Sequence, residues 1–299
     1  MNIHTVFKPA VVEDRPPVPQ AQAWQISFLP AAPEHQSPLA VINEPSRVVA
    51  VATPIELTGA LAMSAGPEEE ALLVVWVPSS AGNIVELDRK LNTWVRRDLA
   101  PNQSPVHASI KTVRITCSQT RAIIYAASEH LSDAMDAVAR FTLAARQTAA
   151  LETQMAVTWP EIRAHTPLTH AVTRRQQRLQ PRVNALTERV TGMKATHLRL
   201  QTALEQLEPT LSGTSKRIYA DLALAAALHD RVEMLEDPVQ FAMDHYELVN
   251  WRMTEIGAAR RGLFLEVVIV IILLADFGMR FLEYVLHATG GISLPFFTQ

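Results

Sequence analysis

Four charged side chains interrupt the most apolar part of this sequence. They are Glu266, Asp276, Arg280 and Glu283. The run from Val267 to Ala275 between them is an unbroken series of strongly apolar residues. Because an ionised side chain inside lipid is costly, such residues normally face a protein partner or water. These four charges are therefore the first candidates for a functional role.

Helical spacing brings the four charges together. At about 100° per residue of an α-helix, they fall within one stripe about 100° wide, which we call the polar stripe. Asp276 and Arg280 are also four residues apart and can neutralise each other. A polar stripe on an apolar helix predicts a helix–helix contact within a membrane. The alternatives are a buried amphipathic helix of a soluble bundle and the lining of a pore.

The sequence offers little support for catalysis or cofactor binding. The Gly-rich phosphate-binding, nucleophile-elbow and His-Glu-x-x-His motifs are absent, so we expect no catalytic, cofactor-binding or metal-ligating residues. His229 and Glu233 are four residues apart on a predicted helix, but we interpret them as an exposed acidic face. The single cysteine, Cys117, excludes an intramolecular disulfide and is expected to be a buried thiol.

The elements that position the polar stripe indicate an α+β protein with a long helical region. The segment 72–77 is rich in β-branched residues, and residues 106–127 read as a strand with a returning strand. Strand signals stop after Ser128. We expect a Pro-rich extended arm over 1–46, in which residues 24–29 are a candidate short strand or docking segment. A small α+β domain follows over 47–128, then a helical coiled-coil stalk over 129–260, one transmembrane helix over 261–287 and a short tail over 288–299.

A second periodic pattern lies within the predicted stalk. Apolar positions alternate at spacings of three and four residues, which defines a heptad seam typical of a coiled coil. The seam consists of Val183, Leu186, Val190, Met193, His197, Leu200, Leu204 and Leu207. Its partner could be another helix of the same chain or a second copy. His197 either sets the register or makes the pairing pH-sensitive.

Charge distribution predicts orientation and partners. Arg260 and Arg261 precede the apolar helix, and no Lys or Arg follows His287, so the positive-inside rule places the N-terminal part on the cytoplasmic or organelle-interior side. The net charge of −3 makes nucleic acid an unfavoured partner. The basic cluster at Arg174, Arg175, Arg178 and Arg182 keeps open an RNA-tethering alternative. The expected partners are the lipid bilayer, further copies of the chain and a possible protein partner.

Two short patterns carry a family resemblance. Residues 231–235 read Arg-Val-Glu-Met-Leu, and about 30 residues later Leu265–Glu266 opens the apolar run. Together with LLVVWV at 72–77, this order resembles the "required for meiotic nuclear division" family of membrane proteins. Departures from that family include Pro78 where a glycine is usual. The resemblance implies a membrane-anchored, oligomerising protein without known catalytic residues.

We therefore predict a non-catalytic, membrane-anchored, oligomeric scaffold or tethering protein. The alternative is a subunit of an oligomeric ion channel or transporter. The layout is similar to divalent-cation channels of the CorA type, which place an α+β domain before long helices and a membrane segment. Those channels carry two spans with a Gly-Met-Asn motif between them, whereas this sequence has room for one span and lacks the motif.

Overall fold

A computed structural model describes residues 21–33, 36–63, 71–79, 85–100, 103–170, 172–173, 176–206, 208 and 211–288. The chain divides into two compact units. The first takes its described residues from 1–157 and 192–239, and the second takes its own from 158–191 and 240–299. The helices α3 (Leu131–His165), α4 (Gln180–Glu205) and α7 (Glu236–Ala288) contribute residues to both units.

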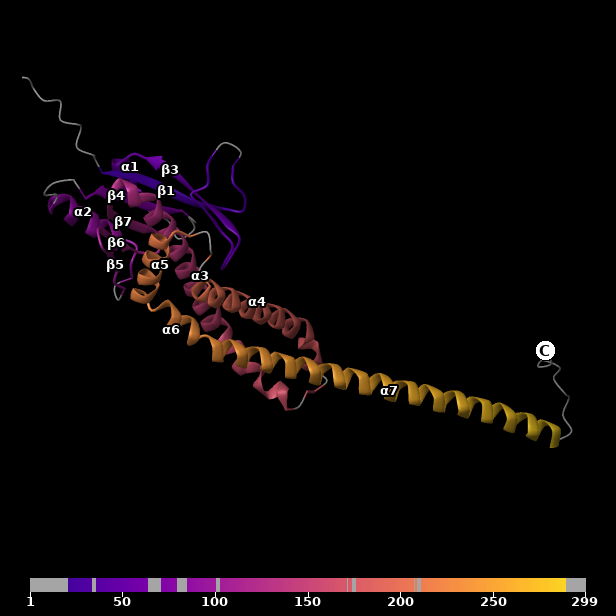
Figure 1. Ribbon diagram of the computed structural model, residues 1–299. Coiled ribbons are helices and arrows are strands. Elements are labelled where there is room, and N and C mark those ends of the chain that lie inside the picture. The colour runs from indigo at the N-terminus through magenta and orange to yellow at the C-terminus, as the bar shows by residue number, and fades with distance from the viewer. Residues whose placement is uncertain are drawn as a thin grey trace, which may run out of the picture. The chain divides into compact units, whose positions relative to one another are not determined.

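The first unit is built on a seven-stranded sheet with the strand order β2-β3-β1-β4-β7-β6-β5 (Figure 1). β4 and β7 are parallel and all other neighbours are antiparallel, so the sheet is mixed and the α+β class is confirmed. The strands are β1 (Gln22–Leu29), β2 (Ala40–Ile42), β3 (Val48–Ile55), β4 (Leu72–Pro78), β5 (Val106–Ile110), β6 (Val113–Cys117) and β7 (Arg121–Ala126).

Helices cover both faces of this sheet. Every residue of β4 is buried, and alternate residues of a strand point to opposite faces. On one face, Leu73 and Val75 pack with Trp94 of α2 (Val85–Arg96) and with α1 (Leu57–Ala62). Leu72 and Val74 face the other way and are fully buried as well. That second face is covered by α3 and α5 (Gly213–Ala225).

Strands β1 and β2 correct the extended arm expected over 1–46. β1 lies between β3 and β4 and pairs with both, so it is a central strand of the sheet. Its sequence from Gln22 to Leu29 contains no proline, and Ala23, Ile26 and Phe28 are buried. Pro30 and Pro33 follow the strand instead of interrupting it. The part of the expected arm over 1–20 lies outside the described residues.

The first unit also extends past residue 128, where we expected a separate stalk to begin. Arg140 of α3 lies 2.8 Å from Asp136 and 2.8 Å from Glu208, and it donates a 3.1 Å hydrogen bond to the carbonyl of Val41 in β2. Burial of this guanidinium between two carboxylates ties α3 to the edge of the sheet. The backbone of Ser109 in β5 likewise donates to the carboxylate of Asp221 in α5. These helices therefore belong to the α+β unit.

The heptad seam is covered within a single chain. Seven of its eight positions are buried, from Val183 to Leu204, and Leu207 lies outside the described residues. In the first unit, Nε2 of His197 lies 3.0 Å from the carbonyl oxygen of Val232 in α6 (Leu228–Glu233). In the second unit, Asn250 of α7 donates a 2.8 Å hydrogen bond to Thr187 of α4. Of the two partners that the sequence left open, the structure shows the intramolecular one.

Short 3-10 turns complete the described elements. They are η1 (Ser128–His130), η2 (Thr166–Thr169) and η3 (Gln176–Leu179).

One buried arginine makes the sheet sensitive to substitution. Arg121 is 1% exposed, donates to the carbonyls of Trp94 and Met63, and lies 2.9 Å from a carboxylate oxygen of Asp98. Arg121→Ala leaves these acceptors without their donor, so we expect a loss of about 3–5 kcal/mol in the free energy of unfolding. Denaturant unfolding of the full chain in detergent, followed by tryptophan fluorescence, measures it.

The matched control for this substitution is Arg96→Ala. The Arg96 side chain is exposed at the end of α2. We expect its removal to cost less than about 1 kcal/mol. Equal effects of the two substitutions would contradict a structural role for Arg121.

Candidate functional site

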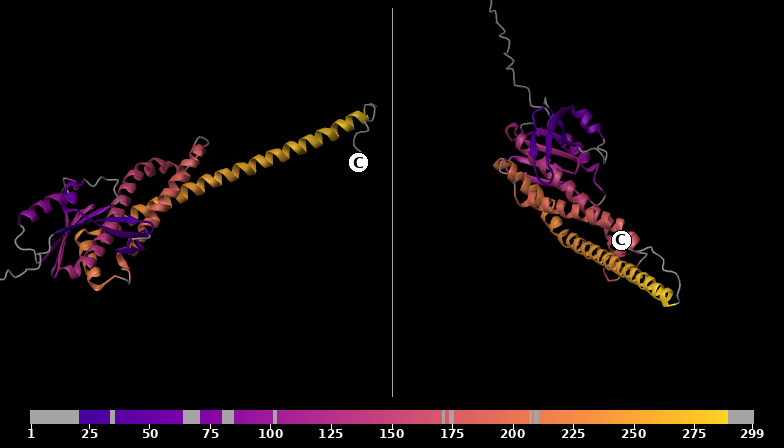
Figure 2. Two further views of the ribbon diagram at one scale, coloured as in Figure 1. Left: turned by 90° about the horizontal axis from the view of Figure 1, so that it is seen from above. Right: turned by 90° about the vertical axis from the view of Figure 1, so that its right-hand side faces the viewer.

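Helix α7 contains the candidate site. It is continuous over 53 residues from Glu236 to Ala288 (Figure 2), which corresponds to about 80 Å at 1.5 Å per residue. Its segment Gly262–Val285 is 24 residues long and is apolar enough to cross a membrane. None of that segment is buried by the rest of the described chain. Within the described residues it is the one helix with these properties.

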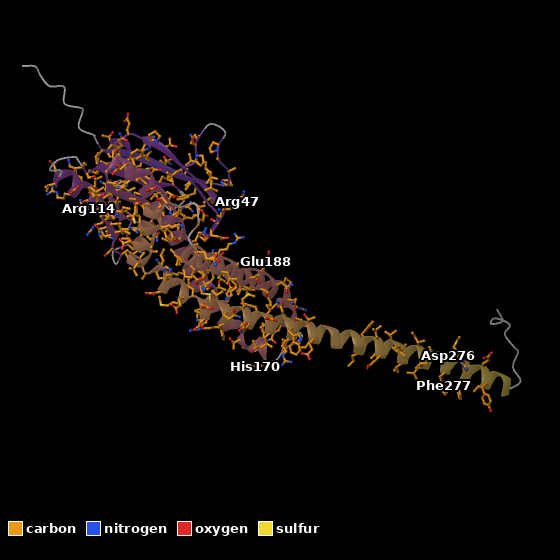
Figure 3. All side chains as sticks on the ribbon, viewed as in Figure 1. Arg47, Arg114, His170, Glu188, Asp276 and Phe277 are labelled. Atoms are coloured by element: carbon orange, nitrogen blue, oxygen red, sulfur yellow. The ribbon has the colours of Figure 1, made fainter. Side chains whose placement is uncertain are left out.

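The polar stripe lies on this exposed segment. Nε of Arg280 is 3.2 Å from Oδ2 of Asp276, so the ion pair inferred from the i,i+4 spacing is present. Both side chains remain more than half exposed in the isolated chain. Figure 3 shows Asp276 and Phe277 projecting from neighbouring positions of the helix. Glu266 and Glu283 are exposed on the same segment.

The part of α7 that precedes the apolar segment packs within the second unit. It does so through the face opposite to the polar stripe. Tyr246 and Val249 are fully buried, and Met253 is 3% exposed. Gln180 of α4 donates to the side chain of Asn250, which donates in turn to Thr187. Placed around the helix axis at about 100° per residue, the centre of this buried face lies about 175° from the centre of the polar stripe. The chain's own packing therefore leaves the polar stripe uncovered.

Gly262 is a site residue that we did not single out from the sequence. It is separated from Asp276 and Glu283 by 14 and 21 residues, which are whole multiples of the heptad. A Cβ atom built on Gly262 meets no heavy atom within 4 Å. The signal for Gly262 in the sequence is this spacing of whole heptads from two of the charged residues. A glycine on the face of the stripe allows close approach of another helix.

A cluster of aromatic and imidazole rings holds the part of α7 that precedes the apolar segment against α3. Nδ1 of His165 lies 3.2 Å from the hydroxyl oxygen of Tyr246. The ring of His245 stacks on Phe241 at 6.0 Å and meets Tyr246 edge-on at 5.3 Å. Burial lowers the pKa of His245, and the neighbouring His165 lowers it further. Burial is also the main cause of the lowered pKa of His165, with Arg182 adding to it.

Other candidate chemistry is weaker in the described residues. A cavity of about 260 Å³ is lined by His197, His229, Glu233 and neighbouring residues of α4, α6 and α7. Among the described residues, no three His, Cys, Asp or Glu side chains are grouped closely enough to hold a metal ion. The thiol of Cys117 is buried, which raises its pKa to about 12.

The basic cluster is only partly described. Arg182 lies 3.3 Å from a carboxylate oxygen of Glu161. Arg174 and Arg175 lie outside the described residues.

Comparisons with known proteins give few constraints. No protein-family model matches the sequence, and no curated protein is similar to it. Among solved structures, the full-length CmaX protein aligns over 82% of this chain and 84% of its own length, with 12% identity and a TM-score of 0.33. At that level of similarity the alignment supports no conclusion about fold or function.

The imidazole cluster predicts that the second unit loses stability in acid. The folded-state pKa of His165 and of His245 lies below the value of about 6.5 expected in the unfolded chain. The unfolded chain therefore binds more protons than the folded one, and stability falls as the pH drops below about 6.5. We expect the denaturant midpoint of the full chain in detergent to decrease between pH 7.5 and 5.5.

Replacing one ring tests the origin of this decrease. His245→Phe keeps an aromatic ring beside Phe241 and Tyr246 but removes a titrating group, and Nε2 of His245 has no hydrogen-bond partner to lose. We expect the variant to have a shallower pH dependence than the native chain. His229→Phe, at an exposed position, is the control. An unchanged slope in His245→Phe would contradict the assignment.

Proposed function

We propose that this protein is a membrane-anchored, non-catalytic scaffold that self-associates through the polar stripe of its C-terminal helix. One observation carries the proposal. The charged side chains of an exposed, membrane-compatible helix lie on the face opposite to the one that the chain buries itself. A face that is polar where lipid is expected, and that no part of the described chain covers, is suited to contact with another protein.

The exposed apolar surface of α7 supports a lipid environment for residues 262–285. Large side chains such as Ile272, Leu273 and Phe281 are each about 60% exposed. Soluble monomers rarely expose contiguous apolar surface beyond a few hundred Å², and larger patches indicate a membrane or protein contact. A single helix presenting such side chains on most of its circumference is better solvated by lipid than by one protein partner.

Flanking charge supports an orientation. Arg260 and Arg261 immediately precede the span. By the positive-inside rule, the α+β unit and the part of α7 before residue 262 would then lie on the cytoplasmic or organelle-interior side. The resemblance to the "required for meiotic nuclear division" family implies the same arrangement of a soluble domain followed by a C-terminal anchor.

Copies of the same chain are suitable partners for the polar stripe. They insert with one orientation and carry the same charges at the same depth in the bilayer. In a parallel pair, Arg280 of one copy can approach Asp276 or Glu283 of the other, all within two helical turns. Interhelical polar contacts and small residues are what associate helices in lipid, where the hydrophobic effect does not.

Membrane anchorage is tested by extraction at alkaline pH. Alkaline carbonate releases peripheral proteins but not spanning helices. We expect the full chain to remain in the membrane pellet and a chain truncated before Gly262 to appear in the supernatant. Release of the full chain would contradict the anchor.

Self-association through the polar stripe is tested by a matched pair of glycines. Gly262 and Gly278 both face open space within the chain, and they lie about 160° apart around α7. In Gly262→Leu the new side chain overpacks the contact, which costs about 1–3 kcal/mol and weakens association about 5- to 150-fold. Gly278→Leu places the same side chain on the lipid-facing side and should leave association unchanged.

Chemical cross-linking in membranes and sedimentation in detergent measure this difference. Equal association of the two glycine variants would contradict the polar stripe as the contact.

A channel subunit is the second candidate, because several copies of the polar stripe could surround an aqueous path. The 3.2 Å ion pair between Arg280 and Asp276 favours the scaffold, since it neutralises two of the charges within one helix. Ion flux into liposomes that is lost in Asp276→Leu would favour the channel instead.

A further inference from the structure

Positive charge is concentrated where α3 ends and α4 begins. The sequence between Glu161 and Glu188 contains no Asp or Glu, although the whole chain has a net charge of −3. In the described part of this stretch, Arg163 lies in the last turn of α3, Arg178 lies in η3 and Arg182 lies in the first turn of α4. All three side chains are exposed. We call these three arginines the basic tip.

Helix α4 runs antiparallel to α7 within the second unit. The hydroxyl of Thr191 donates to the sulfur of Met243 at 3.8 Å, and the hydroxyl of Thr187 accepts a hydrogen bond from Asn250. Earlier residues of α4 therefore contact later residues of α7. The first turn of α4, which contains Arg182, consequently lies on the side of Asn250 that leads to the apolar segment of α7.

Helix α3 runs parallel to α7. The ring of Trp159 lies 5.7 Å from that of Phe241, and further along both helices Nδ1 of His165 lies 3.2 Å from the hydroxyl oxygen of Tyr246. The end of α3 and the start of α4 therefore both point along α7 toward Gly262–Val285, the segment that can cross a membrane. The basic tip lies at this end of the two helices.

The length of α7 places the basic tip near the proposed membrane surface. Asn250, which both Gln180 and Thr187 contact, precedes Gly262 by twelve residues, or about 18 Å along the helix axis. Lipid headgroups occupy about 5–8 Å outside the hydrocarbon core. The distance that remains is about 10 Å, which is close to the Debye length at physiological salt. Charges on the basic tip can therefore be attracted by charged headgroups.

The exposed carboxylates of α7 are arranged differently along the helix. Asp244 and Glu247 precede the contact with α4, so they lie farther from the apolar segment. On the other side of that contact, Glu255 is paired with Arg252 at 3.2 Å. No other Asp or Glu occurs in the sequence before Glu266. Unpaired negative charge is therefore not expected to cancel the attraction of the basic tip to an anionic surface.

Acidic neighbours neutralise only part of the basic tip. Arg182 lies 3.3 Å from a carboxylate oxygen of Glu161, and the Arg182 side chain remains 61% exposed. Among the described residues, Arg163 and Arg178 form no ion pair, and the guanidinium of Arg163 lies 5.8 Å from the centre of the Trp159 ring. Positive charge is thus left over at the end of the second unit that faces the apolar segment.

We propose that the basic tip binds anionic phospholipid headgroups of the membrane that α7 spans. This inference rests on the proposed function, because α7 must hold the basic tip beside a bilayer. Arginine suits this partner, since its guanidinium is always charged and binds two phosphate oxygens at once. The cytoplasmic leaflet is negatively charged and attracts basic segments close to a span. Lipid charge then holds the second unit at the membrane surface in addition to the helical anchor.

Lipid binding by the full chain tests the inference. The chain is purified in a non-ionic detergent and titrated with phosphatidylglycerol or with phosphatidylcholine of the same acyl chains. Native mass spectrometry counts the lipids that are retained. We expect Arg178→Gln/Arg182→Gln to lower the affinity for phosphatidylglycerol about tenfold and to leave the affinity for phosphatidylcholine unchanged.

Two further variants separate local charge from net charge and from folding. Arg89→Gln/Arg96→Gln removes two exposed arginines of α2 and changes the net charge by the same amount. We expect it to bind both lipids as the native chain does. Arg178→Lys/Arg182→Lys keeps the positive charge of the basic tip, and we expect it to lose less than about threefold in affinity for phosphatidylglycerol.

The outcomes separate this inference from the proposed function. Equal affinity for phosphatidylglycerol in the two glutamine variants, in a chain that stays in the membrane pellet at alkaline pH, would overturn the basic tip and leave the anchor standing. Release of the full chain at alkaline pH would overturn both. Binding of a labelled single-stranded RNA that is lost in Arg178→Gln/Arg182→Gln, with lipid binding unchanged, would replace the lipid by nucleic acid. Selective loss of phosphatidylglycerol in that variant supports the proposed contact.

Discussion

A charged side chain in the hydrocarbon core of a bilayer needs an opposite charge, a protein dipole or water within reach. If α7 spans a membrane as proposed, the constraint falls on Asp276, Arg280 and their two acidic neighbours. The pair Asp276–Arg280 satisfies part of it within one helix, at 3.2 Å. The remaining acidic charge lies on the same face, and the described chain places no helix there. The proposed assembly follows from this uncovered face.

The packing of the second unit determines which face of α7 is left for a partner. The second unit buries Tyr246, Val249 and Met253 of α7, which removes one face of the helix from any outside contact. On this side Tyr246 contacts His165 of α3, and Asn250 binds Thr187 of α4. The opposite face of α7 carries the polar stripe, which the described chain leaves exposed. In the first unit, the buried guanidinium groups of Arg121 and Arg140 are bound by the carbonyl of Trp94 and the carboxylate of Glu208, respectively.

The sequence was informative where structure depends on neighbouring residues. The apolar span, the Asp276–Arg280 pair and the strand at 72–77 each follow from local composition or spacing, and each is present. Local patterns did not predict which helix or strand packs against a given segment. The seam at Val183 and Leu200 has the same heptad pattern whether it meets α6 and α7 or a second chain. The central position of β1 depends on pairing with β3 and β4, which no pattern within 1–46 encodes.

The number of chains in the intact assembly tests the central claim most directly. Native mass spectrometry of the full-length protein released from lipid nanodiscs gives this number without substitution or cross-linker. The proposed contact predicts a defined assembly of two or more copies that persists on dilution in the bilayer. A single copy per nanodisc at every protein-to-lipid ratio would contradict it.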